Sequence, residues 1–141
     1  DSSYNYNKSL VHFYEKEAVY YNDTIIDKMS GYLKSMKKIT RENNSDFLVV
    51  YVPGQIEVSK PQDIDYYPHH INIQDTSLYN LNRPNHIIRE LCRKHDIKLF
   101  DTEKVLAEHP NQPVYYPESW HWNVEGHKLI AKELAKRINI D

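Results

Sequence analysis

The residue types best suited to catalysis lie together in one short segment, residues 115–127. His121 stands there between Trp120 and Trp122, and Glu118 precedes it by three positions. A histidine that serves as general base for a serine needs a neutral imidazole. It also needs a carboxylate on the other ring nitrogen, which fixes the tautomer and stabilises the imidazolium. We therefore expect His121 to be a general base oriented by Glu118; a structural loop histidine and a solvated carboxylate are the alternatives.

This segment resembles the final block of the SGNH/GDSL hydrolases, in which an Asp-x-x-His motif precedes the last helix. The likeness is greater to the His-Trp-Asn-x-x-Gly-His pattern of their polysaccharide O-acetyltransferase and acetylesterase relatives, of the alginate-acetylation type. That pattern runs here from His121 to His127. The resemblance covers residues 23–138, where 47–53 is similar to a late core strand and 97–101 to the last strand. It implies a flavodoxin-like SGNH hydrolase fold, a three-layer α/β/α sandwich with a parallel sheet.

The activity that the resemblance implies is that of a serine esterase or O-acyltransferase, with acetyl esters, including those of carbohydrates, as expected substrates. The chain departs from the family pattern at its acid, which is Glu118 where the family has aspartate. Some relatives carry the acid two positions before the histidine, and that position is Ser119 here.

The Gly-Asp-Ser nucleophile block, the oxyanion-hole glycine and the Gly-x-Asn block have no counterpart in the sequence. None of the three glycines stands in a matching context: Gly31, Gly54 and Gly126. Asp1 and Ser2 form an Asp-Ser pair, but no apolar strand precedes it. We therefore expect the chain to be the C-terminal portion of such a domain, with its nucleophile upstream of Asp1, and to be inactive by itself.

Two other functions fit parts of the sequence. One is a non-catalytic module of the same fold that binds carbohydrate or another protein. The other is a metal-dependent hydrolase that would use His69, His70 and His121, with Asp63 and Asp65 nearby. Adjacent histidines rarely both reach one ion, and a catalytic zinc needs three well-placed protein ligands. We therefore expect neither a metal nor a cofactor.

Three longer helices are expected to support these residues. The spacing of apolar side chains predicts an amphipathic helix over 23–42 and a second helix over about 82–95. Asn123 is the expected cap of the last helix, because its side chain can accept a backbone N–H. His127, in the first turn of that helix, is expected to pack rather than to bind a ligand. The expected buried face of the last helix consists of Ile130, Ala131, Leu134 and Ile138.

Two strands are expected between these helices, over 47–52 and 97–100. The first is an unbroken apolar run, which is typical of a strand buried on both faces, and Pro53 and Gly54 turn the chain directly after it. Asp101 follows the second strand as the expected cap of a short helix. The alternation of helices and strands predicts parallel strands with right-handed crossovers. In such sheets sites lie outside the carboxyl ends of the strands, where the long loop 55–80 begins.

Composition excludes several classes of protein. The 141 residues suffice for one domain, in which residues 1–22 are an irregular N-terminal segment. Eighteen basic and twenty acidic residues give a net charge of −2, without the basic excess of a nucleic-acid binder. No apolar run reaches the length of a transmembrane helix. Cys92, the one cysteine, lies in an apolar periodic stretch and is expected to be buried. Two strands make an incomplete sheet, so we expect an exposed edge that favours self-association.

Overall fold

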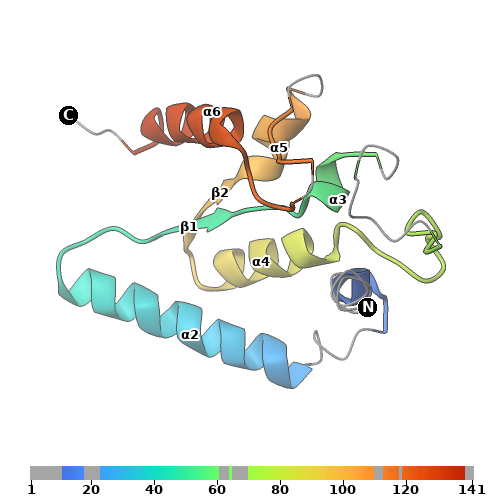
Figure 1. Cartoon of the computed structure of the whole chain (residues 1–141). Coiled ribbons are helices and arrows are strands. Elements are labelled where there is room, and N and C mark those ends of the chain that lie inside the picture. Colours follow the sequence, from blue (N-terminus) through green and yellow to red (C-terminus); the bar gives the residue numbers. More distant parts are fainter. Residues whose placement is uncertain are drawn as a thin grey trace.

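The computed structural model describes residues 11–17, 23–60, 64, 70–109, 113–117 and 119–138. Its centre is a pair of parallel strands with helices on both sides (Figure 1). The elements in chain order are η1 (His12–Tyr14), α2 (Asp23–Glu42), β1 (Leu48–Tyr51), α3 (Gln55–Val58), α4 (Arg83–Lys94), β2 (Lys98–Asp101), α5 (Thr102–Ala107) and α6 (Val124–Ala135). The expected mixed α/β class with a parallel strand pair is therefore confirmed.

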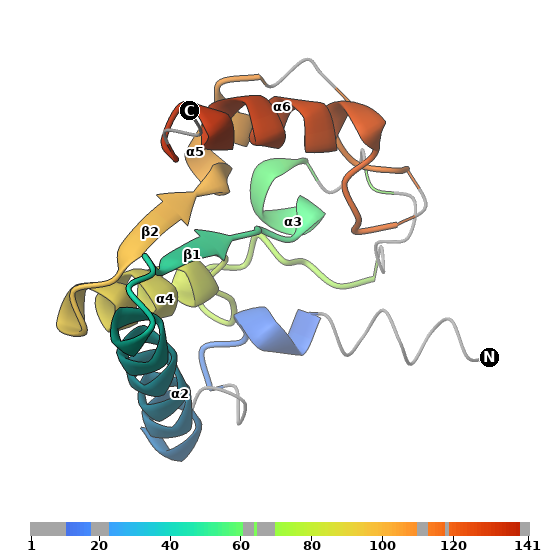
Figure 2. The ribbon, with the colours of Figure 1, turned by 90° about the vertical axis from the view of Figure 1, so that its left-hand side faces the viewer.

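The parallel register brings both strand ends to the same edge of the sheet. Leu48 lies opposite Lys98, and Tyr51 lies opposite Asp101. β1 leads through a short turn into α3, and β2 leads directly into α5, so both short helices begin at the carboxyl edge (Figure 2). Helices α2 and α4 lie on one side of the strands, and α5 and α6 lie on the other (Figure 1).

Local side-chain hydrogen bonds explain where two helices begin. The Asp101 carboxylate accepts the backbone N–H of Glu103 over 3.1 Å at the start of α5. The Asn123 side-chain oxygen accepts the N–H of Gly126 over 3.0 Å at the start of α6. Each bond satisfies an N–H that the first helical turn leaves without a partner. Both expected caps are confirmed.

Two non-glycine residues with positive φ end the helices that precede the strands. Asn44 follows α2 with a φ of 53°, and Asp96 follows α4 with a φ of 51°. The N–H of Ile97 then bonds back to the carbonyl oxygen of Cys92 over 2.8 Å. This left-handed ending reverses the chain direction and sends it from each helix into the next strand.

The apolar side chains form two clusters, and α3 contributes to both. The first cluster, between the strands and helices α5 and α6, contains Phe100, Val105, Leu106, Val114, Tyr115 and Ile130. The second contains Val11, Tyr14, Ile64 and Ile73. Val58 of α3 packs on the first cluster and Ile56 of α3 on the second. Within the expected irregular N-terminal segment, residues 12–14 therefore form η1, and Val11 and Tyr14 supply part of a core.

Burial of β1 differs from the expectation of a strand covered on both faces. Val50 is 38% exposed and Val52 is 53% exposed. In the described residues β2 is the only strand that pairs with β1, so the other edge of β1 has no neighbour to cover it. The expected face of α6 is also only partly right. Ile130 is buried, whereas Ala131 and Ile138 are exposed, because α6 covers a sheet of only two strands.

Helix α2 packs against α4. The Ser30 hydroxyl lies 2.6 Å from Nε2 of His95, and Lys37 Nζ donates to the carbonyl oxygen of His95 over 2.8 Å. The outer part of the apolar stripe of α2 is exposed at Tyr32, Met36 and Ile39. Cys92 of α4 is 2% exposed, as expected. No helix within the described ranges is both long enough and apolar enough to cross a membrane.

Candidate functional site

His121 lies at the end of a short hairpin that leads into α6. Tyr115 and Trp122 form an isolated antiparallel bridge, and the N–H of Tyr116 donates to the carbonyl oxygen of His121 over 3.1 Å. These contacts bring residues 115–116 beside residues 121–122, and we call residues 115–122 the His121 hairpin. Backbone pairing therefore fixes the base of this hairpin independently of its side chains.

Asn123 and Gly126 join the hairpin to the helix. The N–H of Asn123 donates to the carbonyl oxygen of Val114 over 2.9 Å, and its side-chain amide donates to that of Tyr115 over 3.2 Å. Gly126 packs against the backbone just before the hairpin, because a Cβ placed on it would lie 2.3 Å from the Val114 oxygen. The Asn-x-x-Gly spacing thus provides both the helix cap and the close approach of helix and hairpin.

The His121 hairpin meets the carboxyl end of β1 around a pocket of about 390 Å³. We call it the His121 pocket. Its lining residues are Val52, Pro53, Gly54, Trp120, His121, Trp122 and His127. Two segments that are almost 70 residues apart in the sequence therefore form one site, at the edge where open α/β sheets place theirs. The lining is rich in indole and aliphatic carbon, with two imidazoles as its polar groups.

The His121 side chain is exposed, and its ring centroid lies 5.5 Å from that of Trp120. The backbone N–H of His121 donates to Ser119 Oγ over 3.3 Å. Among the described residues, no hydroxyl or carboxylate is hydrogen-bonded to the imidazole. Glu118 lies outside the described residues, so the expected bond between Glu118 and His121 stays a prediction.

The two remaining aromatic groups of the pocket contact each other. The rings of Trp122 and His127 meet edge to face, with centroids 5.7 Å apart. The indole N–H of Trp122 is buried and has no hydrogen-bond partner in the described part of the chain. The His127 ring thus contacts Trp122 at the wall of the pocket while the residue as a whole is exposed, and its expected packing role stays a prediction.

A second polar group at the carboxyl edge, Glu57 of α3, did not emerge from the sequence. Its carboxylate accepts hydrogen bonds from the hydroxyls of Tyr14 and Tyr51 and from the N–H of Gly54. Burial raises the pKa of Glu57. The three hydrogen bonds oppose that rise, and the nearby Glu103 adds to it. One feature of the sequence could have pointed to Glu57. It lies three residues after Gly54, which is the spacing of a capping box at the start of a helix.

The carboxyl end of β2 carries a separate polar group. Arg89 Nε donates to Asp101 over 3.0 Å, and the Asn85 amide donates to both Asp101 and Glu103. Asn85, Arg89 and Glu103 border a hollow of about 330 Å³. Asp101 also caps α5, so this network ties α4 to the start of α5.

The Ser30 and His95 pair has the composition of a nucleophile and its base, with 2.6 Å between Oγ and Nε2. Ser30 is buried between α2 and α4, however, and the pair lies at the C-terminal end of α4, near the amino ends of the strands. An ester would need an open pocket and oxyanion donors there. This hydrogen bond therefore fits a link between two helices.

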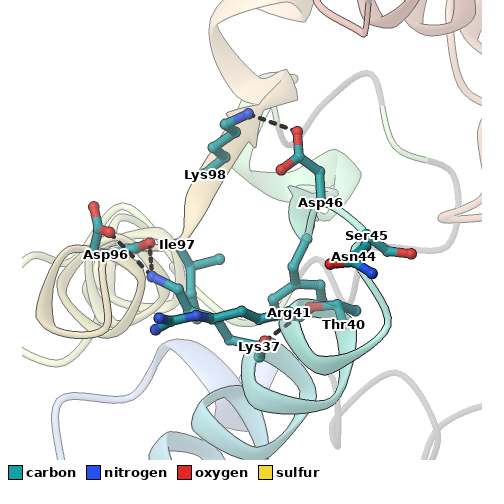
Figure 3. Close-up of a pocket in the computed structure, with 10 residues that line it drawn as sticks. Lys37, Thr40, Arg41, Asn44, Ser45, Asp46, Asp96, Ile97 and Lys98 are labelled. Atoms are coloured by element: carbon teal, nitrogen blue, oxygen red, sulfur yellow. Dashed lines mark hydrogen bonds and ion pairs between the residues drawn. The ribbon is translucent and has the colours of Figure 1, made fainter.

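A hollow of about 410 Å³ lies at the amino ends of the strands (Figure 3). Its charged side chains are largely engaged with one another. Lys37 Nζ bonds to the backbone and side-chain oxygens of Asp96, and Lys98 Nζ lies 3.0 Å from the Asp46 carboxylate. These pairs hold the left-handed turn after α4 and the start of both strands.

The metal alternative gains no support from the geometry. His70 is described and exposed, whereas His69, Asp63 and Asp65 lie outside the described residues. Within the ranges that the structure describes, no group of three or more histidine, cysteine, aspartate or glutamate side chains is placed to hold a metal ion.

The His121 pocket is thus the site that the sequence and the structure indicate together. Comparisons with known protein families, with curated proteins and with solved structures gave no match to this chain.

Proposed function

We propose that this chain is part of a serine esterase or O-acyltransferase that acts on acyl esters, with His121 as general base and Glu118 as the acid that orients it. The observation that carries the proposal is the His121 pocket. There a histidine from the loop before α6 lies beside the turn that follows β1. The proposal includes the finer fold: the described strand pair, with helices on both sides, would be part of an SGNH-type three-layer sandwich.

The chemical step follows from the role of His121. The imidazole removes the proton from a serine hydroxyl while the serine oxygen bonds to the acyl carbon, and it then gives that proton to the departing alcohol. Water or an acceptor hydroxyl then attacks the acyl carbon of the acyl-serine while the imidazole removes its proton. The imidazole returns that proton to the serine oxygen as the bond between serine and acyl group breaks. No described serine is hydrogen-bonded to the His121 ring, and the proposal assigns the nucleophile to none of the described residues.

The walls of the pocket support an ester of a carbohydrate as substrate. Trp120 and Trp122 flank His121 and offer flat apolar surfaces, and Val52 and Pro53 add aliphatic carbon. Mostly apolar linings with a few convergent polar groups are typical of small-molecule sites. An acetyl group and the carbon face of a sugar ring both suit such a lining.

The second candidate is a non-catalytic binding module with the same pocket. It is favoured by the state of His121, which has no hydroxyl or carboxylate partner among the described residues. In that case the two tryptophans would bind carbohydrate, and His121 would contribute a polar contact without activating a nucleophile.

Hydrolysis of p-nitrophenyl acetate by the complete protein separates the two candidates. We expect turnover that His121→Ala lowers about a thousandfold or more, because members of a catalytic triad act as a unit. His86→Ala is the matched control, since His86 is exposed on α4, on the other side of the strands. Full activity in the His121 variant would remove the assignment. The 141-residue chain by itself should show a solution mass that is a multiple of its own 16.8 kDa if the exposed edge of β1 drives self-association.

A further inference from the structure

The turn at Pro53 and Gly54, which lines one side of the His121 pocket, is held by hydrogen bonds from two directions. Tyr115 Oη donates to the carbonyl oxygen of Pro53 over 2.8 Å in a buried bond. The N–H of Gly54 donates to Glu57 Oε1 over 2.7 Å, and the N–H of Glu57 donates to the carbonyl oxygen of Gly54 over 2.9 Å. The first bond ties the turn to the His121 hairpin, and the other two tie it to α3.

Glu57 extends this connection to distant parts of the chain. Its Oε1 also accepts from Tyr14 Oη over 2.9 Å, and its Oε2 accepts from Tyr51 Oη over 2.5 Å. Three donors around one carboxylate match an ionised group, which can only accept hydrogen bonds. Burial raises the pKa of Glu57, whereas the bonds from Tyr51, Gly54 and Tyr14 oppose that rise. Glu57 therefore joins η1, the end of β1 and the turn through one partly buried carboxylate.

Space around the turn is as restricted as its hydrogen bonding. A Cβ on Gly54 would lie 2.6 Å from Tyr14 Oη and 3.4 Å from Glu57 Oε1. Tyr14 is itself buried in the second apolar cluster and cannot move aside without disturbing it. The Tyr14 hydroxyl therefore occupies the space that a side chain at Gly54 would need, and a shift of the turn away from α3 would break the bond from the Gly54 N–H to Glu57.

We propose that Glu57 is a positioning residue of the His121 pocket, which sets the place of the turn at Pro53 and Gly54 against the aromatic side of the pocket. The inference rests on the function proposed above. Glu57 does not line the pocket and acts through the turn. Misplacement of a substrate-binding wall by about 1 Å can lower a rate by roughly a hundredfold, so a residue outside the chemistry can have a large effect.

The test compares two substitutions of Glu57 with a control that removes a similar link elsewhere. Glu57→Gln keeps the shape and an acceptor for the Gly54 N–H, and the Tyr51 hydroxyl can turn to accept from the new amide. Glu57→Ala removes every bond. Ser30→Ala is the matched control, because it removes the partly buried 2.6 Å bond between Ser30 and His95, at the opposite end of the strands from the pocket. Each variant is measured for kcat and KM with p-nitrophenyl acetate and for the NMR signals of the pocket.

We expect Glu57→Ala to lower kcat about tenfold or more and Glu57→Gln to retain most of the activity. The ring signals of His121 and the indole signals of Trp120 and Trp122 should shift in Glu57→Ala and stay in place in Ser30→Ala. Unchanged kcat and unchanged signals in Glu57→Ala would overturn the proposal, as would equal shifts in Ser30→Ala.

Two further outcomes are also decisive. If Glu57→Ala does not fold, the milder Tyr14→Phe and Tyr51→Phe variants, which each remove one hydroxyl donor, carry the test by the same signals. If the complete protein hydrolyses no ester, the proposed function fails. The position of the turn is then judged from the His121 and tryptophan signals alone, so the two failures are distinguishable.

Discussion

Replacing Gly126 with alanine should destabilise the protein at the junction of α6 and the His121 hairpin. The added Cβ would lie 2.3 Å from the carbonyl oxygen of Val114 and 3.1 Å from Cβ of Trp122. The normal separation of a carbon and an oxygen without a bond exceeds 3 Å, so the chain must move. The nearest atom belongs to the backbone of a paired hairpin, which cannot rotate away as a flexible side chain could.

The size of the effect follows from two opposing contributions. Forcing an extra carbon into close-packed space costs about 1–3 kcal/mol, and a contact as short as this one lies at the upper end. Alanine in place of glycine within a helix returns up to about 1 kcal/mol. We expect a net loss of about 2 kcal/mol. For a domain of this size that corresponds to a fall in Tm of roughly 6–8 °C.

Gly31→Ala is the control, because it is the same substitution within a helix. No atom lies within 4 Å of the position that its Cβ would take. The helix-propensity gain should then stand alone and raise the free energy of unfolding by about 0.5–1 kcal/mol. Thermal unfolding followed by circular dichroism measures both variants. A Gly126→Ala protein with a Tm equal to or above that of the parent would refute the packing described at this junction.

Two further predictions concern buried polar groups near the carboxyl edge. Thr102 is fully buried, and its hydroxyl donates to the carbonyl oxygen of Tyr51 over 2.6 Å. Thr102→Val should therefore lower the free energy of unfolding, measured by urea titration, by about 1–3 kcal/mol. An unchanged free energy of unfolding would show that this bond contributes little. Burial raises the pKa of Glu57 above its ordinary 4.5, so the folded state binds the proton more tightly than the unfolded state. The stability linked to this proton is fully present below pH 4.5 and is lost as the pH rises through the raised pKa. The free energy of unfolding of the parent minus that of Glu57→Gln should therefore be larger at acid than at neutral pH, and the opposite slope would contradict the raised pKa.

Features that depend on neighbouring residues were predictable from the sequence. The caps at Asp101 and Asn123 form bonds to N–H groups two and three residues away, so residue type and spacing suffice to place them. The helix over 23–42 was predictable for the same reason, because its apolar spacing is a property of the helix alone. His121 was singled out by a compact local pattern of the same kind, and its role as a general base stays a prediction.

Features that depend on distant residues were not predictable. The exposure of Val50 is set by what lies beside β1, which the residues of the strand do not specify. Glu57 meets Tyr14 across 43 positions of sequence, and no local pattern connects the two. The partial burial of the apolar face of α2 has the same origin. An amphipathic stripe predicts that one face of a helix is buried. How many helices and strands pack on that face, however, depends on the whole fold.

The burial of Cys92 makes this thiol a reporter on the opening of the protein. It is 2% exposed in α4, and burial raises its pKa, so both access and thiolate content are low while the protein is folded. An alkylating reagent should therefore label it only when α4 separates from the strands. Because it is the one cysteine in the chain, the labelling rate can be assigned to a single position. Measured against denaturant concentration, that rate distinguishes local fraying of α4, which exposes little surface, from complete unfolding, which exposes much.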